Sequence, residues 1–192
     1  NLYKELLNFC TVDLSAFYFD IRKDTLYCDP INSAKRKSCI TVLNILLNSL
    51  LKWFAPILSF TTEEIYQLVS KKNKSIHLER FLDFPKKFEN NQIAQKWSEL
   101  IKIRDICNIS IEEKRTSKEI GSSLEADLTI YLDKETQKIV KDVDLSEVCI
   151  TSAAEIREGQ QETIKVETKK AEGEKCPVCW KISKESCKRH KI

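Results

Sequence analysis

The sequence predicts a mainly α fold that changes character towards its C-terminus. Apolar residues recur at helical spacing through the first 115 residues, alternate with a period of two in LEADLTIYL, and finally give way to closely spaced cysteines. These patterns divide the chain of 192 residues into a helical bundle (1–115), a small α/β unit (116–172) and a C-terminal peptide (173–192).

The first two helices follow from apolar spacing and from one strong helix breaker. Residues 2–21 carry apolar side chains at near-helical intervals, which predicts one amphipathic helix. The second helix is expected to start at Asn32 or Ser33, because either side chain is a suitable N-cap. It is expected to run towards Pro56, where its continuation becomes costly.

Two further helices complete the predicted bundle. Thr61 and Glu64 have the spacing of a capping box, which predicts a third helix through Val69 that closes at the lysines of 71–74. After a proline-containing loop, a fourth helix is expected to begin near Asn91. Its apolar residues are expected to face the bundle, and they are Trp97, Leu100, Ile101, Ile103, Ile106 and Ile109.

The α/β unit is expected to contain three strands and one short helix. A helix starting at Asp133 follows the first strand, and the segments 146–156 and 162–171 are predicted as the second and third strands. The unit ends at Gly173. The residues of the first strand that alternate inwards are Leu124, Ala126, Leu128, Ile130 and Leu132.

Composition limits the class of protein. The charges are nearly balanced, with 32 basic and 29 acidic residues, so the composition does not by itself indicate a nucleic-acid-binding protein. Basic clusters at 35–37, at 71–74 and over the tail are either solvated surface charges or a local basic footprint. The eight cysteines lack the regular framework of a secreted disulfide scaffold, which favours a reducing cytoplasm.

One apolar run raises the alternative of a membrane span. It covers residues 39–60, but Lys52 near its middle argues against insertion, so a buried bundle helix explains the run better. The N-terminal stretch lacks the features of a signal peptide. The absence of methionine, including at position 1, suggests a chain cut from something longer.

The strongest chemical signal is the ligand pattern of the C-terminal peptide. Cys176 and Cys179 form a C-x2-C pair, and Cys187 and His190 form a C-x2-H pair seven residues further on. Two such pairs suit a tetrahedral zinc ion, and a segment with so few apolar residues needs a metal to become ordered. Because four protein ligands leave no position for an activated water, the zinc is expected to be structural.

Two roles stay open for Trp180, which follows the second ligand directly. It could stack on an unpaired base while adjacent lysines neutralise phosphates, or it could pack as a lid over the metal knuckle or against the α/β unit. His77 has no nearby nucleophile or carboxylate pair that would give it a catalytic role. A Gly-rich phosphate loop is excluded because the chain contains only three glycines. The residues alone therefore predict a binding module without an active site.

Five stretches carry a resemblance to a known family. In chain order they are LSAFYFDIRKDTLY (14–27), WFAPILSFTTEEIY (53–66), IRDICN (103–108), KEIGSSLEADLTIY (118–131) and CPVCW (176–180). Together they resemble the C-terminal region of bacterial-type isoleucyl-tRNA synthetases over essentially the whole chain. The resemblance implies a helical-bundle anticodon-binding domain, a small α/β junction domain and a C-terminal zinc-binding knuckle that reaches the anticodon end of tRNA(Ile).

The resemblance also implies an activity for the parent enzyme, which couples isoleucine to tRNA with ATP. This chain lacks the His-Ile-Gly-His and Lys-Met-Ser-Lys-Ser type motifs and an editing domain, so it is expected to be inactive by itself. The implied partners are tRNA(Ile) and the rest of the synthetase chain, in a cytoplasmic monomer. The residues expected to contact tRNA are Trp180, Lys181, Lys188 and Arg189.

Two departures from the family pattern concern the knuckle. The family usually supplies four cysteines with a longer spacer, whereas here the fourth ligand is His190 and the spacer is short. Histidine is an ordinary zinc ligand, so the metal prediction is unchanged. The chain also stops two residues after His190, where relatives continue with a basic segment. An alternative function therefore stays open, in which the zinc module braces the C-terminal domains without direct anticodon readout.

Overall fold

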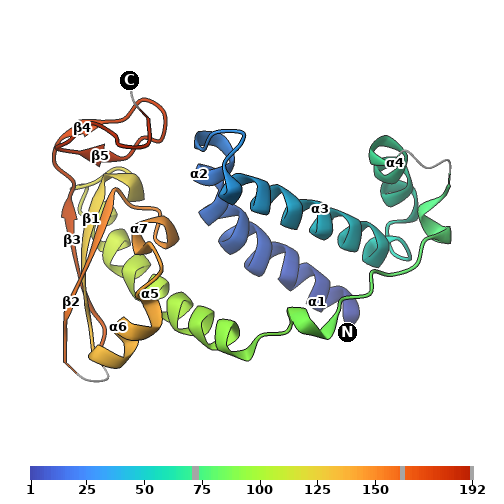
Figure 1. The fold of residues 1–192 in the computed structure, drawn as a ribbon, viewed down its shortest axis with the longest axis horizontal. Helices are drawn as coiled ribbons and strands as arrows, with labels where there is room; N and C mark the ends of the chain where they lie inside the picture. The colour runs from blue at the N-terminus through green and yellow to red at the C-terminus, as the bar shows by residue number, and fades with distance from the viewer. Residues whose placement is uncertain (71–73, 161–162, 191–192) are drawn as a thin grey trace. The chain divides into compact units, whose positions relative to one another are not determined.

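The computed structural model groups the chain into two compact units (Figure 1). The residues that it describes are 1–70, 74–160 and 163–190. Unit 1 comprises Asn1–Asp24 and Asn90–Ile192, and unit 2 comprises Thr25–Glu89. This grouping places the N-terminal residues with the C-terminal half of the chain, which the sequence pattern did not indicate. The division into three domains stays a prediction.

Helices dominate the first 116 residues, and strands follow them. The α-helices are α1 (Leu2–Asn8), α2 (Asp20–Cys28), α3 (Ala34–Phe54), α4 (Ser59–Val69), α5 (Asn91–Thr116), α6 (Lys134–Val140) and α7 (Leu145–Val148). The strands are β1 (Ala126–Leu132), β2 (Ala153–Glu158), β3 (Lys165–Lys170), β4 (Glu174–Lys175) and β5 (Ile182–Ser183). The remaining helical segments are a π-helix (Phe9–Phe19) and 3-10 turns at Ile76–Leu78, Lys86–Phe88 and Ser123–Glu125.

The N-terminal helical stretch is longer than predicted. α1, the π-helix and α2 follow one another directly, so the helical backbone continues to Cys28 instead of ending at Ile21. Pro30 accounts for the observed end, because the residue before a proline is disfavoured in helical conformation. Leu6, Leu14 and Ile21 are buried, which agrees with the predicted apolar face.

α3 agrees with the second predicted helix. The Ser33 hydroxyl caps it by accepting a hydrogen bond from the Arg36 backbone N–H at 3.4 Å, and the helix ends at Phe54, two residues before Pro56. The chain's apolar run lies largely on this helix. Among the described residues, no helix is at once long enough and apolar enough to cross a membrane.

The predicted capping box of α4 is wrong. The helix begins at Ser59, so Thr61 and Glu64 lie inside its first turns, and Leu58 occupies the N-cap position. The helix ends at Val69, and of the lysines expected to close it at 71–74, Lys71 and Lys72 lie outside the described residues. Unit 2 has its own small core where α3 and α4 meet, formed by Leu51, Ala55, Tyr66 and Ile76.

The glutamate before Glu64 ties α4 to the chain that follows it. The Glu63 carboxylate accepts hydrogen bonds from the side chain of Gln67 at 2.7 Å, from the Ser75 hydroxyl at 2.8 Å and from the Ile76 backbone N–H at 2.8 Å. These donors, Gln67 first, lower the pKa of Glu63. Glu63, for which no role was predicted, thus connects α4 to the residues Ser75 and Ile76.

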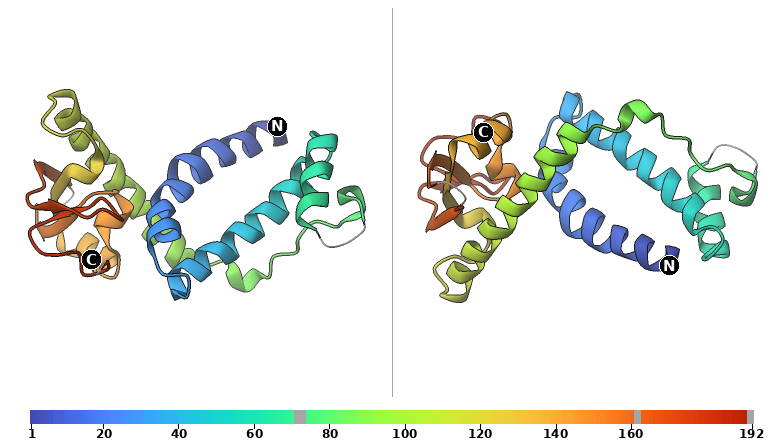
Figure 2. Two further views of the ribbon diagram at one scale, coloured as in Figure 1. Left: turned by 90° about the horizontal axis from the view of Figure 1, so that it is seen from above. Right: turned by 90° about the horizontal axis from the view of Figure 1, so that it is seen from below.

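The buried face of α5 differs in part from the predicted one. Leu100 and Ile103 are fully buried as expected, whereas Ile101 and Ile109 are exposed. Cys107 continues the buried face instead, because α5 packs along one face of the sheet in unit 1 (Figure 2). The core of this unit is therefore a helix-on-sheet layer and not the interior of a bundle.

β1 is the central strand of a three-stranded sheet with the order β2-β1-β3, parallel to β2 and antiparallel to β3. The predicted alternation is confirmed from Ala126 onwards, whereas Leu124 precedes the strand in a 3-10 turn. The side chains that face the helices are fully buried, and they are Ala126, Leu128, Ile130 and Leu132.

The remaining elements of the α/β unit agree with the prediction in two of three cases. α6 follows an N-cap at Asp133, and β3 lies within the predicted segment 162–171. The predicted strand 146–156 is wrong in its first half, where Leu145–Val148 form α7. Asp144 accepts a hydrogen bond from the Ser146 N–H at 2.9 Å, and this N-cap favours a helical turn before β2 begins.

Candidate metal centre

A two-stranded hairpin of β4 and β5 frames the first pair of predicted ligands. Glu174 pairs with Ser183 and Lys175 pairs with Ile182 in antiparallel register. The turn between these strands contains Cys176 and Cys179, and backbone hydrogen bonds close it at 2.9 Å from the Cys176 N–H to the Lys181 carbonyl and from the Trp180 N–H to the Cys176 carbonyl. The hairpin thus holds the first pair in a tight knuckle.

Gly173 allows this hairpin to form. Its backbone has a φ of +122°, and a Cβ at this position would lie 2.1 Å from the Ser183 carbonyl oxygen. Only glycine fits both the conformation and the close approach.

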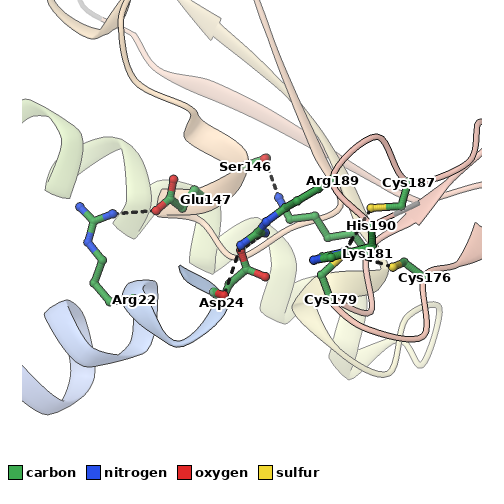
Figure 3. A network of polar contacts seen from close by, with 10 residues as sticks. All are labelled: Arg22, Asp24, Ser146, Glu147, Cys176, Cys179, Lys181, Cys187, Arg189 and His190. Atoms are coloured by element: carbon green, nitrogen blue, oxygen red, sulfur yellow. Dashed lines mark hydrogen bonds and ion pairs between the residues drawn. The ribbon is translucent and has the colours of Figure 1, made fainter. Parts of the chain in front are cut away.

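All four predicted ligands converge on one point (Figure 3). Their donor atoms lie within 4.8 Å of one another. The Cys179 and Cys187 sulfurs are 3.9 Å apart, and His190 Nδ1 lies 3.6 Å from the Cys176 sulfur and 3.4 Å from the Cys187 sulfur. Cys176 and Cys179 are buried, and the other two are half-buried. Three sulfurs and one imidazole in this arrangement could hold a metal ion.

Backbone amides prepare two of the thiols for metal binding. The N–H groups of Cys179 and Val178 lower the pKa of Cys176 to about 6. Burial acts to raise the pKa of Cys187, but the N–H groups of Arg189 and His190 outweigh it, so the pKa is lowered. Burial raises the pKa of the Cys179 thiol to about 11. Because cysteine binds metals as thiolate, these amides favour the metal-binding form of Cys176 and Cys187.

The structure divides the four residues predicted to contact RNA into two pairs. Trp180 is 58% exposed, and the Lys188 side chain is 88% exposed beside Glu185. The other two contact residues outside the C-terminal peptide. Lys181 Nζ donates to the Ser146 hydroxyl at 2.9 Å, and Arg189 forms an ion pair with the Asp24 carboxylate.

Trp180 has an unusual backbone conformation. Its φ is +63°, in the left-handed region that favours glycine, and the Lys175 ammonium lies 5.4 Å from the centroid of the indole ring. A residue with a Cβ stores strain there. Because a glycine would suit this turn better and the ring is more than half exposed, neither the backbone nor core packing explains the choice of tryptophan.

Sequence reasoning missed the residues that anchor the knuckle to the rest of unit 1. Ser152 accepts a hydrogen bond from the Ile182 N–H at 2.6 Å, and Ser146 accepts one from Lys181. The Asp24 carboxylate forms an ion pair with the Arg189 guanidinium. The backbone carbonyl of Asp24 accepts a further hydrogen bond from the same guanidinium at 3.2 Å. Single serines and aspartates far along the chain carry no motif that could have identified these contacts.

His77 is a residue for which no catalytic role was predicted. It lies in a 3-10 turn of unit 2, where its backbone N–H donates to the Ser75 hydroxyl at 3.2 Å. In the described part of the chain, the Cys/His cluster is the one group of three or more such donors close enough to share a metal ion.

Comparison with known proteins identifies the chain's family. Residues 1–131 match the family described as the anticodon-binding domain of tRNA ligase. The chain is 66% identical over 190 residues to an isoleucine--tRNA ligase of Pelagibacter ubique (strain HTCC1062), which covers 99% of this chain and 21% of that protein. It is 42% identical over 190 residues to the isoleucine--tRNA ligase of Bradyrhizobium diazoefficiens, covering 93% of this chain and 19% of that protein.

A third relative, the isoleucine--tRNA ligase of Methylacidiphilum infernorum, is 42% identical over 183 residues, covering 95% of this chain and 20% of that protein. The chain thus spans about a fifth of the length of the curated relatives that it matches. Because the family match extends over more than half of its residues, the chain belongs to the anticodon-binding domain family of tRNA ligases.

Proposed function

We propose that this chain binds the anticodon region of tRNA(Ile) as part of an isoleucyl-tRNA synthetase, whose complete form attaches isoleucine to tRNA(Ile) using ATP. The observation that carries the proposal is the 66% identity to an isoleucine--tRNA ligase over 99% of the chain. The partners are tRNA(Ile) and the remainder of the synthetase, in a cytoplasmic monomer. We expect the chain alone to be inactive in aminoacylation, since its sequence lacks the His-Ile-Gly-His and Lys-Met-Ser-Lys-Ser type motifs.

Zinc is the metal that we propose for the Cys/His cluster. In a tetrahedral site, Zn–S bonds of about 2.3 Å and Zn–N bonds of about 2.0 Å place two sulfurs about 3.8 Å apart, and a sulfur and a nitrogen about 3.5 Å apart. The observed separations of 3.9 Å between sulfurs and of 3.4 and 3.6 Å between sulfur and nitrogen support this geometry. Four protein ligands fill the coordination sphere, so the ion would order the peptide and not activate water.

Within the knuckle we assign RNA contact to the exposed pair. Trp180 presents an aromatic face on which an unstacked anticodon-loop base can lie, and Lys188 supplies a cation for a phosphate. Lys181 and Arg189 were predicted to contact RNA as well. Their contacts with Ser146 and Asp24 support a role in positioning the knuckle instead.

Transcripts with altered anticodons test the leading proposal. The chain is titrated with tRNA(Ile) transcripts that carry either the native anticodon or a substituted one, at one salt concentration, because phosphate contacts make affinity depend strongly on salt. A transcript with an altered acceptor end is the matched control. We expect anticodon substitution to weaken binding about tenfold and the acceptor change to have little effect. Equal weak affinity for all transcripts would remove the claim of anticodon recognition.

A second candidate function is favoured by the contacts of the knuckle with the rest of unit 1. The bonds from Ile182 to Ser152 and from Lys181 to Ser146 would let a zinc peptide brace the junction domain without reading the anticodon. In that case Trp180→Ala would change the stability of unit 1 and leave the affinity for tRNA(Ile) intact.

A further inference from the structure

The two ligand pairs of the metal centre are held by different means. The first pair lies in the turn of the β4–β5 hairpin, whose strands and turn hydrogen bonds define its shape. The second pair, Cys187 and His190, lies beyond β5, where the described residues form no helix or strand. Backbone hydrogen bonds of a strand or helix therefore do not fix the loop that carries Cys187 and His190, and side-chain contacts must hold it.

Arg189 supplies such support from between the two ligands. Its guanidinium donates to the carboxylate of Asp24 and, at 3.2 Å, to the backbone carbonyl of Asp24. Arg189 and Asp24 are 165 positions apart, and each side chain is 29% exposed (Figure 3). A charge-assisted, forked contact of this kind restricts the arginine more than a surface ion pair does.

We propose that Asp24 is a remote positioning residue for metal binding. By holding Arg189, it keeps the loop of the second ligand pair close to the conformation in which Cys187 and His190 face the first pair. The bound ion in turn keeps Arg189 on Asp24, because coupling between two binding events is reciprocal. Zinc thereby joins the C-terminal peptide to α2 as well as ordering the peptide itself.

The size of the effect follows from the distance between Asp24 and the metal. Residues that bond directly to a ligand's side chain change metal affinity by about 10- to 100-fold when they are removed. Asp24 acts one residue further out, through Arg189, and its side chain is partly exposed. We therefore expect Asp24→Asn to weaken zinc binding about 3- to 10-fold.

The test measures the zinc dissociation constant of the intact chain by competition with a chromophoric chelator. Asp24→Asn and Arg189→Gln should each weaken binding about 3- to 10-fold, and the double variant should be no weaker than the worse single one. The exchanged pair, Asp24→Arg with Arg189→Asp, should recover most of the affinity. The matched control is Arg22→Gln, which removes a 2.7 Å ion pair with Glu147 from the same helix without touching the ligand loop. Its zinc affinity should stay within about twofold of the parent.

Each outcome bears on the proposal. Unchanged affinity in Asp24→Asn overturns it, and so does an equal loss in Arg22→Gln, which would reveal a general effect of α2 packing. Hydrogen exchange at 20–28, with and without zinc, gives the reciprocal readout, and we expect slower exchange in the zinc-loaded parent but no such difference in Asp24→Asn. The inference rests on the metal centre: a parent chain that binds no zinc overturns both, whereas a zinc-binding parent with an unaffected Asp24→Asn variant overturns this inference alone.

Discussion

Replacement of Trp180 by glycine separates its RNA-binding role from its structural one. At φ +63° a residue with a Cβ costs about 1 kcal/mol more than glycine, so Trp180→Gly relieves strain. Glycine also gives the unfolded chain more freedom, which costs about 0.5–1 kcal/mol. Since the tryptophan is 58% exposed, little core packing is lost. These contributions nearly cancel, so the stability of unit 1 and its zinc affinity should change by less than about 1 kcal/mol.

The effect on RNA binding should be much larger. Stacking of one base on an aromatic side chain contributes about 1–3 kcal/mol. At about 1.4 kcal/mol per factor of ten, the loss of the ring should weaken binding of tRNA(Ile) about 5- to 140-fold. Zinc content and unfolding temperature, measured on the same preparation, should stay close to those of the parent.

Two matched variants sharpen the assay, which is a titration of labelled tRNA(Ile) at fixed salt. Trp180→Phe keeps an aromatic face and the backbone strain, so it should retain most of the affinity. Trp180→Ala keeps the strain and removes the ring, so it should bind RNA as weakly as Trp180→Gly but be the less stable of the two. Native affinity in Trp180→Gly would refute base stacking and favour the bracing function.

Three further changes test the knuckle and unit 2. Cys179→Ser should weaken zinc binding by more than about 100-fold and increase proteolysis near Gly173, while the helical circular dichroism is preserved. Cys28→Ser, at a cysteine outside the cluster, is the control. Equal zinc content in Cys179→Ser and the parent, measured by elemental analysis, would contradict the ligand assignment. Gly173→Ala places a Cβ 2.1 Å from the Ser183 carbonyl oxygen and should destabilise the hairpin by about 2 kcal/mol or more. The measurement is amide hydrogen exchange, which should become faster in β4 and β5. Unchanged exchange would show that the hairpin tolerates the Cβ. The pKa of Glu63 is lowered from 4.5, so its contribution to the stability of unit 2 is complete above about pH 4.5 and disappears as the pH falls through the folded-state pKa. Glu63→Gln should therefore lower the unfolding temperature at pH 7 and match the parent in acid, whereas a constant difference at every pH would contradict this origin.

The starts of α3 and α6 and the central strand could be predicted because their determinants are local. Ser33 and Asp133 each cap a helix through bonds to residues two or three positions away. The alternation that buries Leu128 and Ile130 is likewise visible in a short window. For these elements the spacing in the sequence was sufficient.

The errors in the fold arise where two local signals compete or where the packing partner is distant. The residues around Val148 are apolar and β-branched enough to suggest a strand, but the Asp144 cap directs them into a helical turn. The buried face of α5 was placed wrongly at Ile109, because the sequence does not show that a sheet covers this helix. Apolar periodicity indicates that a face is buried but not what buries it.

In the candidate site, the metal ligands could be predicted from the sequence but the residues that anchor the knuckle could not. Cys176, Cys179, Cys187 and His190 could be identified because zinc selects pairs of ligands at short spacing. Their anchors could not, since the Arg189 contact with Asp24 spans 165 residues and the Lys181 contact with Ser146 spans 35.

The cations of the basic C-terminal peptide have two different roles. Lys181 and Arg189 lie in a basic segment beside a metal knuckle, and both were predicted to contact RNA because of that position. The structure gives each of them a partner outside the C-terminal peptide, whereas the exposed Lys188 side chain pairs at 3.1 Å with Glu185 inside that peptide. If zinc affinity falls when Asp24 loses its charge, then charge reversal at Arg189 should impair RNA binding indirectly, by displacing Trp180, and saturating zinc should restore part of the affinity. Charge reversal at Lys188 should weaken RNA binding at every zinc concentration, so a titration of both variants with zinc distinguishes a cation that positions the knuckle from one that touches RNA.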